Sequence, residues 1–357
     1  MKLFLIGGFL GSGKTTAIRN ACIELLKEGT KVGVITNDQG AQLADTKFIK
    51  SANVPVMEVT EGCFCCNYEK LDGFIDVLQK IDHADIIFAE SVGSCTDIVA
   101  TVIKPLEKYR ENVEIVISVF VDAHLLPTMI QGSRIFVDSV SYIYKKQLEE
   151  ADILIVNKID LLNIIQLEGI RQLVAQRYPL KKILFQNSFE QKNIKQWLKA
   201  LTEFKPQARK SLELDYDIYG DGEAELAWLD AEIEIYTQDK NAFNAGIALI
   251  NKIYAKINAQ SLPIGHLKFL INDGIQQKKI SFTAGNQPSF STDMIVSVSG
   301  KIDMIINARV QTKPEYLKRS ILDCIEEWKK KADVIIIVKN TAAFKPGYPK
   351  PTHRVLD

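Results

Sequence analysis

The chain has 357 residues, which is enough for two domains. Hydrophobic residues make up 46% and charged residues 25%, and Lys plus Arg equal Asp plus Glu at 44 each, so the formal net charge is zero. This balance excludes a general electrostatic attraction to nucleic acid or to anionic membranes. The apolar run at residues 3–6 is too short for a signal peptide, and no stretch approaches the roughly 20 apolar residues that span a bilayer. We therefore expect a cytoplasmic protein with mostly reduced cysteines.

The first 204 residues alternate short apolar runs with amphipathic stretches. The runs predicted to be strands are 2–6, 32–36, 55–59, 86–89, 114–121, 153–156 and 182–185. The stretches predicted to be helices include 14–28, 68–81, 96–109 and 162–177. The alternation predicts an α/β domain over 1–204, with a mostly parallel sheet covered by helices on both faces. It leaves the order of the strands open.

The pattern changes after residue 204. We predict a linker over 205–225, a smaller C-terminal α+β domain over 226–338 and a loose Pro-rich tail over 339–357. Within the second domain the predicted strands are 231–236, 266–272, 280–283 and 304–310, with a further strand at 333–338 and helices at 242–257 and 314–331. Pro314 suits the first turn of the last helix, because its missing N–H would be unpaired there.

Residues 8–15 fit the pattern G-x-x-x-x-G-K-[ST] between a predicted strand and a predicted helix. Glycines let backbone N–H groups surround phosphate oxygens, and the helix N-terminus adds unpaired N–H groups and partial positive charge. We expect Lys14 to reach the β- and γ-phosphates and the Thr15 hydroxyl to bind Mg²⁺. A glycine-rich turn without a ligand is the alternative. The residues expected to bind the nucleotide are Gly8, Gly11, Ser12, Gly13, Lys14, Thr15 and Thr16.

Asn157, Lys158 and Asp160 form an N-K-x-D tetrad just past a predicted strand. A carboxylate such as Asp160 accepts hydrogen bonds from the N1–H and 2-amino groups of guanine, which adenine cannot offer together. A site built on this acceptor rejects other bases, because the carboxylate would be left unpaired. Residues 185–188 follow the next strand and are a candidate for the loop that backs the base.

Another predicted strand ends at Glu90 and is followed by Gly93. A carboxylate at that strand end would lie close to the metal and the γ-phosphate, and Gly93 would let the backbone approach them. A plain junction between strand and loop is the alternative. Asp122, after the strand at 114–121, is a similar but weaker candidate.

Three of the six cysteines, Cys63, Cys65 and Cys66, fall within four residues. Thiolates suit Zn²⁺, Cu⁺ or iron–sulfur chemistry. C-x-C-C is too compressed for a structural zinc half-site, and no second ligand pair follows, so the set suits a metal that is handed over. A redox role is a weaker alternative, and a disulfide between Cys65 and Cys66 would be strained. Cys22 and Cys324 are expected to fill the core, and Cys95 to be a spare thiol rather than an extra ligand.

Taken together, these motifs identify a family resemblance. The phosphate loop, Asn37–Gly40 with Asp45, the cysteine motif, Glu90–Gly93 and Asn157–Asp160 occur in one order. That order and spacing resemble the CobW-like metallochaperone GTPases, of the SIMIBI class of P-loop GTPases. The resemblance covers about the first 200 residues. The second domain resembles the family's C-terminal domain only in size, position and element order.

The resemblance implies that residues 37–45 are a switch whose Asp38 approaches the Mg²⁺ or the transported metal. It implies that Cys63, Cys65 and Cys66 bind a transition metal, usually Zn²⁺ or Co²⁺, and that hydrolysis of GTP releases this metal to a client metalloprotein. It also implies a GTP-dependent homodimer. Ala41 stands where the family usually has a second acidic residue, which weakens the case for a carboxylate that completes the metal site there. The chain also lacks the His-rich stretch of many relatives, so we do not expect bulk metal storage.

We therefore expect a slow GTPase in which Lys14, Thr15 and an acidic residue, Asp38 or Glu90, act on the phosphates and their Mg²⁺. No residue stands out as the one that orients the attacking water, which predicts low intrinsic turnover. A second hypothesis is a GTP-dependent chaperone of a cofactor enzyme, such as a corrinoid protein, with a minor role for the cysteines. A third, a small-molecule kinase, is disfavoured by the N-K-x-D tetrad.

Overall fold

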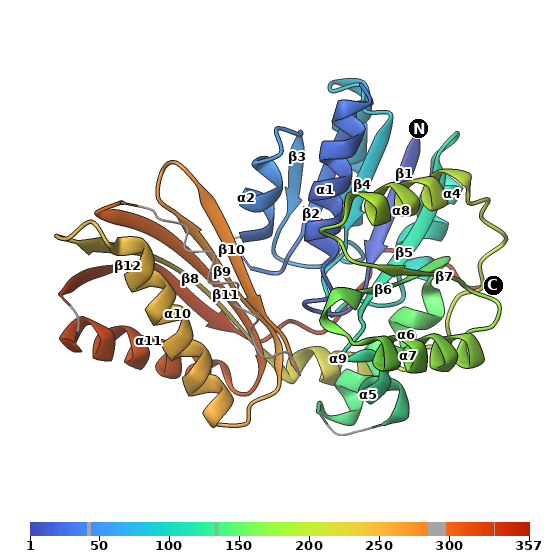
Figure 1. Cartoon of the computed structure of the whole chain (residues 1–357). Helices are drawn as coiled ribbons and strands as arrows, with labels where there is room; N and C mark the ends of the chain where they lie inside the picture. The colour runs from blue at the N-terminus through green and yellow to red at the C-terminus, as the bar shows by residue number, and fades with distance from the viewer. Residues whose placement is uncertain (41–43, 133–134, 285–297, 332) are drawn as a thin grey trace. The chain divides into compact units, whose positions relative to one another are not determined.

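The computed structural model describes residues 1–40, 44–132, 135–284, 298–331 and 333–357, and it divides into two compact units (Figure 1). Unit 1 comprises Met1–Gln39, Asp45–Glu223 and Gly347–Asp357, and unit 2 comprises Gly40–Ala44 and Ala224–Pro346. Most of unit 2 therefore follows Glu223, and the chain returns to unit 1 for its last segment.

Unit 1 is built on a seven-stranded sheet in the order β3-β2-β4-β1-β5-β6-β7, in which every strand pair is parallel. This confirms the predicted parallel sheet. The strands are β1 (Lys2–Gly7), β2 (Val32–Asn37), β3 (Val56–Val59), β4 (Ile86–Glu90), β5 (Glu114–Asp122), β6 (Ile153–Asn157) and β7 (Lys182–Gln186). The helices are α1 (Lys14–Lys27), α2 (Ala44–Lys50), α3 (Tyr68–Lys80), α4 (Lys104–Tyr109), α5 (Leu126–Gln131), α6 (Asp138–Glu150), α7 (Ile164–Arg177), α8 (Gln191–Glu203) and α9 (Tyr216–Ala224).

Helices cover both faces of this sheet, as predicted. On one face, α1 and α8 pack on alternate residues of the strands and bury Cys22 and Trp197 completely. Trp197 lies against the rings of Phe88 and Phe120, at centroid distances of 5.9 and 5.0 Å. On the opposite face, Leu78 of α3 lies directly against Gly33 of β2. Because both faces are buried, the strands are continuous apolar runs.

Unit 2 is an α+β fold, as predicted, with a five-stranded antiparallel sheet in the order β10-β9-β11-β8-β12. Both of its helices pack on one face of that sheet in a single apolar cluster that includes the buried Cys324. None of the helices in the described part of the chain is both long and apolar enough to cross a membrane. The elements are β8 (Leu226–Thr237), α10 (Ala242–Ala259), β9 (Ile264–Asn272), β10 (Gln277–Phe282), β11 (Lys301–Gln311), α11 (Pro314–Lys331) and β12 (Val334–Phe344).

The structure differs from the predicted domain boundaries in two places. The predicted linker at 205–225 contains α9, whose Tyr219 and Glu223 are buried within unit 1. The predicted loose tail at 339–357 begins as the second half of β12, which pairs with β8 as far as Phe344. Its last segment, Gly347–Asp357, belongs to unit 1. Both segments are polar and rich in Gly or Pro, and long-range contacts order them.

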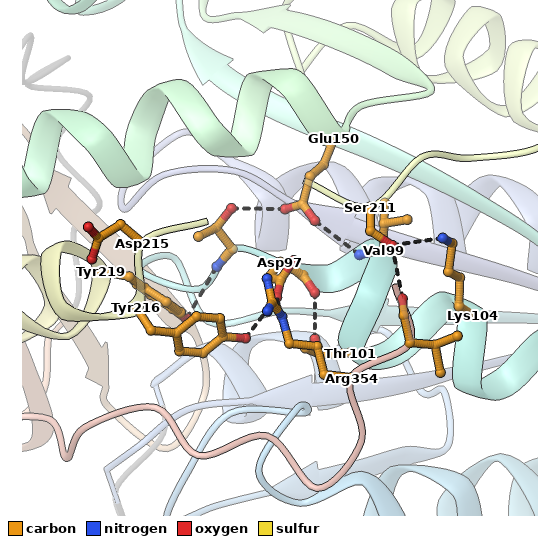
Figure 2. Close-up of polar contacts among 12 residues, drawn as sticks. Asp97, Val99, Thr101, Lys104, Glu150, Ser211, Asp215, Tyr216, Tyr219 and Arg354 are labelled. Atoms are coloured by element: carbon orange, nitrogen blue, oxygen red, sulfur yellow. Dashed lines mark hydrogen bonds and ion pairs between the residues drawn. The ribbon is translucent and has the colours of Figure 1, made fainter. Parts of the chain in front are cut away.

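A buried polar network holds the segment that follows β4 (Figure 2). The carboxylate of Glu150, the last residue of α6, accepts hydrogen bonds from the N–H of Val99 at 3.0 Å and the hydroxyl of Thr96 at 2.9 Å. The N–H of Thr96 in turn donates to the hydroxyl of Tyr219 at 3.3 Å. Burial raises the pKa of Glu150 to about 8, against the opposing effect of these hydrogen bonds.

This raised pKa predicts how Glu150→Gln changes stability with pH. The folded state holds a proton on Glu150 that the unfolded state releases near pH 4.5, so its stabilisation is present at low pH and is lost as pH rises through about 8. Glutamine resembles the protonated form. Between about pH 6 and pH 9 the variant should therefore lose about 1–3 kcal/mol less unfolding free energy than the wild type.

The measurement is urea unfolding at a series of pH values, followed by hydrogen–deuterium exchange of unit 1 peptides. Glu149→Gln, at the exposed neighbouring position of α6, is the matched control. Parallel pH profiles for wild type and Glu150→Gln would contradict the raised pKa.

Candidate functional site

The phosphate loop directly follows β1, and three of its glycines adopt positive φ values. Gly8, Gly11 and Gly13 have φ values of 121°, 73° and 96°. A Cβ on Gly8 would lie 2.1 Å from the carbonyl oxygen of Phe120, and one on Gly13 would lie 2.2 Å from Nδ2 of Asn157. The loop is thus closed by its neighbours, and only glycine fits at these two positions.

Lys14, Thr15 and Glu90 meet beside this loop. Lys14 is buried, and its Nζ donates to the carbonyl oxygens of Gly8 and Phe9, at 2.7 and 3.4 Å. The Thr15 hydroxyl donates to Oε1 of Glu90 at 2.9 Å. The buried Ser12 hydroxyl has no hydrogen-bond partner among the described residues. The loop therefore offers a cation, buried hydroxyls and a carboxylate in one place.

The N-K-x-D tetrad is tied to the phosphate loop through Asn157. Its amide donates to the carbonyl oxygen of Ser12 at 2.8 Å and accepts from the Ser188 hydroxyl at 2.8 Å. Lys158 adopts a left-handed conformation, with φ of 65°, and its ammonium pairs with Asp122 at 2.8 Å. Asp160 is exposed, so a ligand can reach its carboxylate. The structure thus brings residues 157–160 and the 185–188 segment together with the phosphate loop.

The remaining predicted residues lie on the same edge of the sheet. Glu90 ends β4, directly between Ile6 of β1 and Thr36 of β2. A Cβ on Gly93 would lie 2.9 Å from the backbone nitrogen of Leu10, so the segment after β4 packs tightly on the phosphate loop. Asp38 follows β2, and its N–H donates to Val59 at 3.1 Å. Ala41 lies outside the described residues.

Cys63, Cys65 and Cys66 form a compact cluster in the turn before α3. Their sulfur atoms all lie within 4.8 Å of one another, with 3.3 Å between Cys63 and Cys66 and 3.8 Å between Cys65 and Cys66. The N–H groups of Cys66 and Asn67 both donate to the carbonyl oxygen of Cys63, which folds the turn. Cys63 and Cys65 are buried, whereas Cys66 is half-buried.

Asn37 at the end of β2 fixes this turn to the sheet. Its side-chain amide donates to the carbonyl oxygens of Gly62 at 2.7 Å and Val59 at 3.0 Å. Its side-chain oxygen accepts from the N–H of Phe64 at 2.9 Å. Asn37 is the residue after Thr36, which pairs with Glu90. The cysteine turn and the phosphate site are therefore connected through the end of a single strand.

The thiols of this cluster differ in their affinity for protons. Hydrogen bonds from Cys65, Cys66 and Cys95 lower the pKa of Cys63 well below its usual range. Hydrogen bonding to Cys63 raises the pKa of Cys65 well above its usual range and that of Cys66 to about 11. Burial is the main reason that the pKa of Cys95 is also raised. A cation that binds all three sulfurs must displace the protons that they carry, and Cys63 gives up its proton most readily of the three.

Sequence reasoning did not assign two side chains that shape this site. The sequence presents Asn37 only as part of the expected switch, and Gln147 of α6 belongs to none of the motifs. The Gln147 amide donates to the carbonyl oxygens of Gly93 and Cys95, at 3.0 and 2.8 Å, and so fixes the loop that follows Glu90. An asparagine or glutamine at a buried helical or strand-end position was the available signal, but it does not reveal its partner.

The chain is similar in sequence to known proteins. The family model described as CobW/HypB/UreG, nucleotide-binding domain, matches residues 2–185. Zinc chaperone YjiA of Escherichia coli (strain K12) is 36% identical over 94 residues, which are 26% of this chain and 29% of that protein. Zinc chaperone CobW of Sinorhizobium sp is 27% identical over 210 residues, which are 51% of this chain and 57% of that protein. The chain thus spans less than two thirds of either relative's length.

Among solved structures, HypB from Helicobacter pylori in complex with nickel has a TM-score of 0.40 and 17% identity to this chain. The superposed part covers 56% of this chain and 87% of that one.

The position of Asn157 predicts that Asn157→Ala destabilises unit 1. The substitution leaves the buried carbonyl oxygen of Ser12 and the hydroxyl of Ser188 without this partner, which should cost about 1–3 kcal/mol of unfolding free energy. Urea unfolding, followed by hydrogen exchange of peptides from β6 and the phosphate loop, measures the loss. Asn244→Ala, an exposed asparagine in α10, is the control. A loss as small as the control's would show that these hydrogen bonds contribute nothing to stability.

Proposed function

As the chain belongs to the CobW/HypB/UreG family of nucleotide-binding domains, we propose that it is a slow GTPase that delivers a transition-metal ion to a client metalloprotein. Cys63, Cys65 and Cys66 bind the ion. The observation that carries this proposal is the Asn37 amide, which holds the three-thiol turn beside the strand position that faces Glu90. A metal site and a phosphate site share one support.

The phosphate loop suits the triphosphate of GTP. Its glycines leave no Cβ between the backbone N–H groups and a bound anion, and α1 begins at Lys14 with its positive dipole end toward the loop. The Ser12 hydroxyl, buried without a partner among the described residues, is suited to hydrogen-bond a phosphate oxygen. Lys14 exchanges its bonds to Gly8 and Phe9 for bonds to the β- and γ-phosphates.

Thr15 and Glu90 fit Mg²⁺. They place a hydroxyl and a carboxylate 2.9 Å apart, and hard oxygen ligands of this kind are those that Mg²⁺ prefers. When bound, Mg²⁺ supplies charge neutralisation at the β- and γ-phosphates. We assign Thr15 and Glu90 to hold it, with Asp38 entering from the end of β2.

In hydrolysis the bond between the γ-phosphorus and the bridging oxygen breaks, and a bond from water to that phosphorus forms. GDP and phosphate are the products. Lys14 stabilises the negative charge that develops on the leaving oxygen. The oxygen and protons of the attacking water leave with the phosphate product. This mechanism relies on positioning and charge, and it gives a low intrinsic turnover.

The cysteine cluster fits a soft or borderline cation such as Zn²⁺ or Co²⁺. Three sulfurs within 4.8 Å of one another match the thiolate sites of these metals, and hydrogen bonds from the neighbouring thiols lower the pKa of Cys63. Cys66 is only half-buried, so the cluster retains a side that a client's ligand can reach. An open site of this kind favours transfer of the metal over permanent storage.

Nucleotide and metal are coupled through the ends of β2 and β4. Glu90 faces Thr36 across the sheet, and Asn37 follows it and holds Gly62 and Phe64. A change at the γ-phosphate that moves the end of β2 therefore also moves the cysteine turn. Loops of this kind are ordered by a γ-phosphate and released on hydrolysis.

The proposal includes a cytoplasmic location, where thiols stay reduced, and a client metalloprotein as the partner. It includes no nucleic acid, because the net charge is zero. A GTP-dependent homodimer remains a prediction.

The guanine-reading role predicts that Asp160→Asn weakens GTP binding. Losing hydrogen bonds to a charged acceptor should reduce affinity about tenfold to a hundredfold. The asparagine amide can instead donate to the 2-carbonyl of xanthine, so binding of xanthosine triphosphate should improve. Titration with fluorescent nucleotide analogues measures both, and the gain for xanthine controls for misfolding. Unchanged preference for guanine would remove Asp160 from the base site.

The metal-binding role predicts that the Cys65→Ser/Cys66→Ser variant loses transition-metal binding. Competition with a chromogenic chelator measures the affinity for Zn²⁺ and Co²⁺, with and without Mg²⁺ and a non-hydrolysable GTP analogue. We expect about one ion per wild-type chain, bound more tightly with the analogue, and at least about tenfold weaker binding in the variant. Cys324→Ala, buried in unit 2, is the control.

A metal affinity that is the same with and without the GTP analogue would contradict the proposal. It would favour the alternative, a GTP-dependent chaperone of a cofactor enzyme in which the cysteines have a minor part.

A further inference from the structure

The last segment of unit 1, residues 347–357, crosses the surface next to the cysteine turn. We refer to this segment as the strap. It contains Pro349 and Pro351, and it is neither helix nor strand. Its own sequence predicts no structure, so its position depends on contacts with the rest of unit 1.

Two residues of the strap contact the cysteine turn directly. The N–H of Lys350 donates to the sulfur of Cys66 at 3.3 Å. The N–H of Thr352 donates to the carbonyl oxygen of Cys65 at 2.8 Å, and its hydroxyl donates to that of Cys66 at 3.3 Å. The strap thus hydrogen-bonds to Cys66, the one cysteine of the cluster that is not buried.

The strap is anchored before this contact point. The hydroxyl of Tyr348 donates to Asp217 of α9 at 3.0 Å, and its ring packs on Gly220. Pro349 is buried. These contacts fix the chain immediately before Lys350 and so keep its N–H pointing toward the sulfur of Cys66.

Anchors also follow the contact point. His353 packs on the rings of Tyr68 and Tyr109, with centroids 4.8 and 5.6 Å away. Arg354 donates to Asp97 at 2.8 Å, beside the hydroxyl of Tyr216, which donates to the same carboxylate oxygen at 2.7 Å (Figure 2). Asp97 is fully buried. A charge-assisted bond to a buried carboxylate is among the stronger surface-to-core contacts a segment can make.

An N–H that points at a metal-binding sulfur does two things. It stabilises the thiolate, because the acceptor becomes negatively charged when the metal replaces the proton. It also fixes the direction of the sulfur lone pairs, in the way that outer hydrogen bonds orient other metal ligands. Removing such a partner commonly weakens metal binding by about tenfold to a hundredfold.

We propose that the strap is a positioning element of the metal site, in which the N–H of Lys350 orients Cys66 and Thr352 fixes the turn that carries Cys65 and Cys66. The inference rests on the proposed metal binding by these cysteines. In this inference, residues 347–357 control the rate at which the metal dissociates from the cluster. Release of the strap frees Cys66 and opens the exposed side of the cluster.

Lys350→Pro tests this, because it removes the N–H and places a ring carbon where that N–H approached the Cys66 sulfur, so the strap can no longer sit against Cys66. Lys350→Ala is the matched control, since it removes the same side chain and keeps the N–H. The full-length protein is loaded with Co²⁺, and the sulfur-to-cobalt absorption band is recorded. The rate of Zn²⁺ loss to a chromogenic chelator is measured in parallel.

We expect Lys350→Pro to shift the absorption band and to lose Zn²⁺ about tenfold faster, with Lys350→Ala like the wild type. Wild-type behaviour of both variants would overturn the inference and leave the proposed function intact. A wild type that binds neither metal would overturn the proposed function, and the inference with it.

Should Lys350→Pro fail to fold, Thr352→Val removes only the hydroxyl bond to Cys66, and Thr352→Ser restores it. Faster Zn²⁺ loss in the valine variant alone supports the inference. Equal rates in both variants count against it.

Discussion

The hydrogen bonds of the Asn37 amide are the constraint on which the rest of the site depends. A turn that carries neighbouring cysteines has no regular structure to hold it, and its sulfurs repel one another once they are ionised. Asn37 satisfies Gly62, Phe64 and Val59 from the rigid end of a buried strand. Because the amide is buried and fully used, the turn has a defined position before any ligand arrives. A preformed turn reduces the conformational entropy that metal binding would otherwise have to overcome.

The site combines two kinds of group. Some must exchange a proton or a bonding partner during function, and they lie next to buried polar groups whose hydrogen bonds stay fixed. In the proposed function the thiols give up protons to a metal ion, and Lys14 exchanges its bond to Gly8 for bonds to phosphate oxygens. The Gln147 amide and the Glu150 carboxyl, by contrast, are buried on α6 and are fixed to the backbone after β4. A buried network that is largely satisfied resists rearrangement, since each broken bond leaves a desolvated polar group. The moving parts are therefore confined to the loop edge of the sheet.

The parallel sheet and the phosphate loop could be predicted from the sequence, because both depend on local residue patterns. Strand runs such as 153–156 and the glycine spacing of residues 8–15 have one structural solution each, and the parallel sheet followed from them. The bond from Asn157 to Ser12, the Asn37 clamp and the position of the strap could not be predicted. Each joins residues far apart in the chain, and a polar residue does not specify its partner. The glycines and acidic residues of α9 are typical of a linker, and they give no sign that Tyr219 is buried.

The order of the segments in unit 1 has a consequence for how the protein is made. The ribosome completes β1 to α9 first, then the main part of unit 2 from Ala224 to Pro346, and only then residues 347–357. Throughout that interval the cysteine turn is already synthesised, yet the segment that donates to Cys66 has not emerged. A nascent chain therefore presents a more open thiol cluster than the finished protein does. Loading during synthesis and loading after it are chemically different events for this molecule.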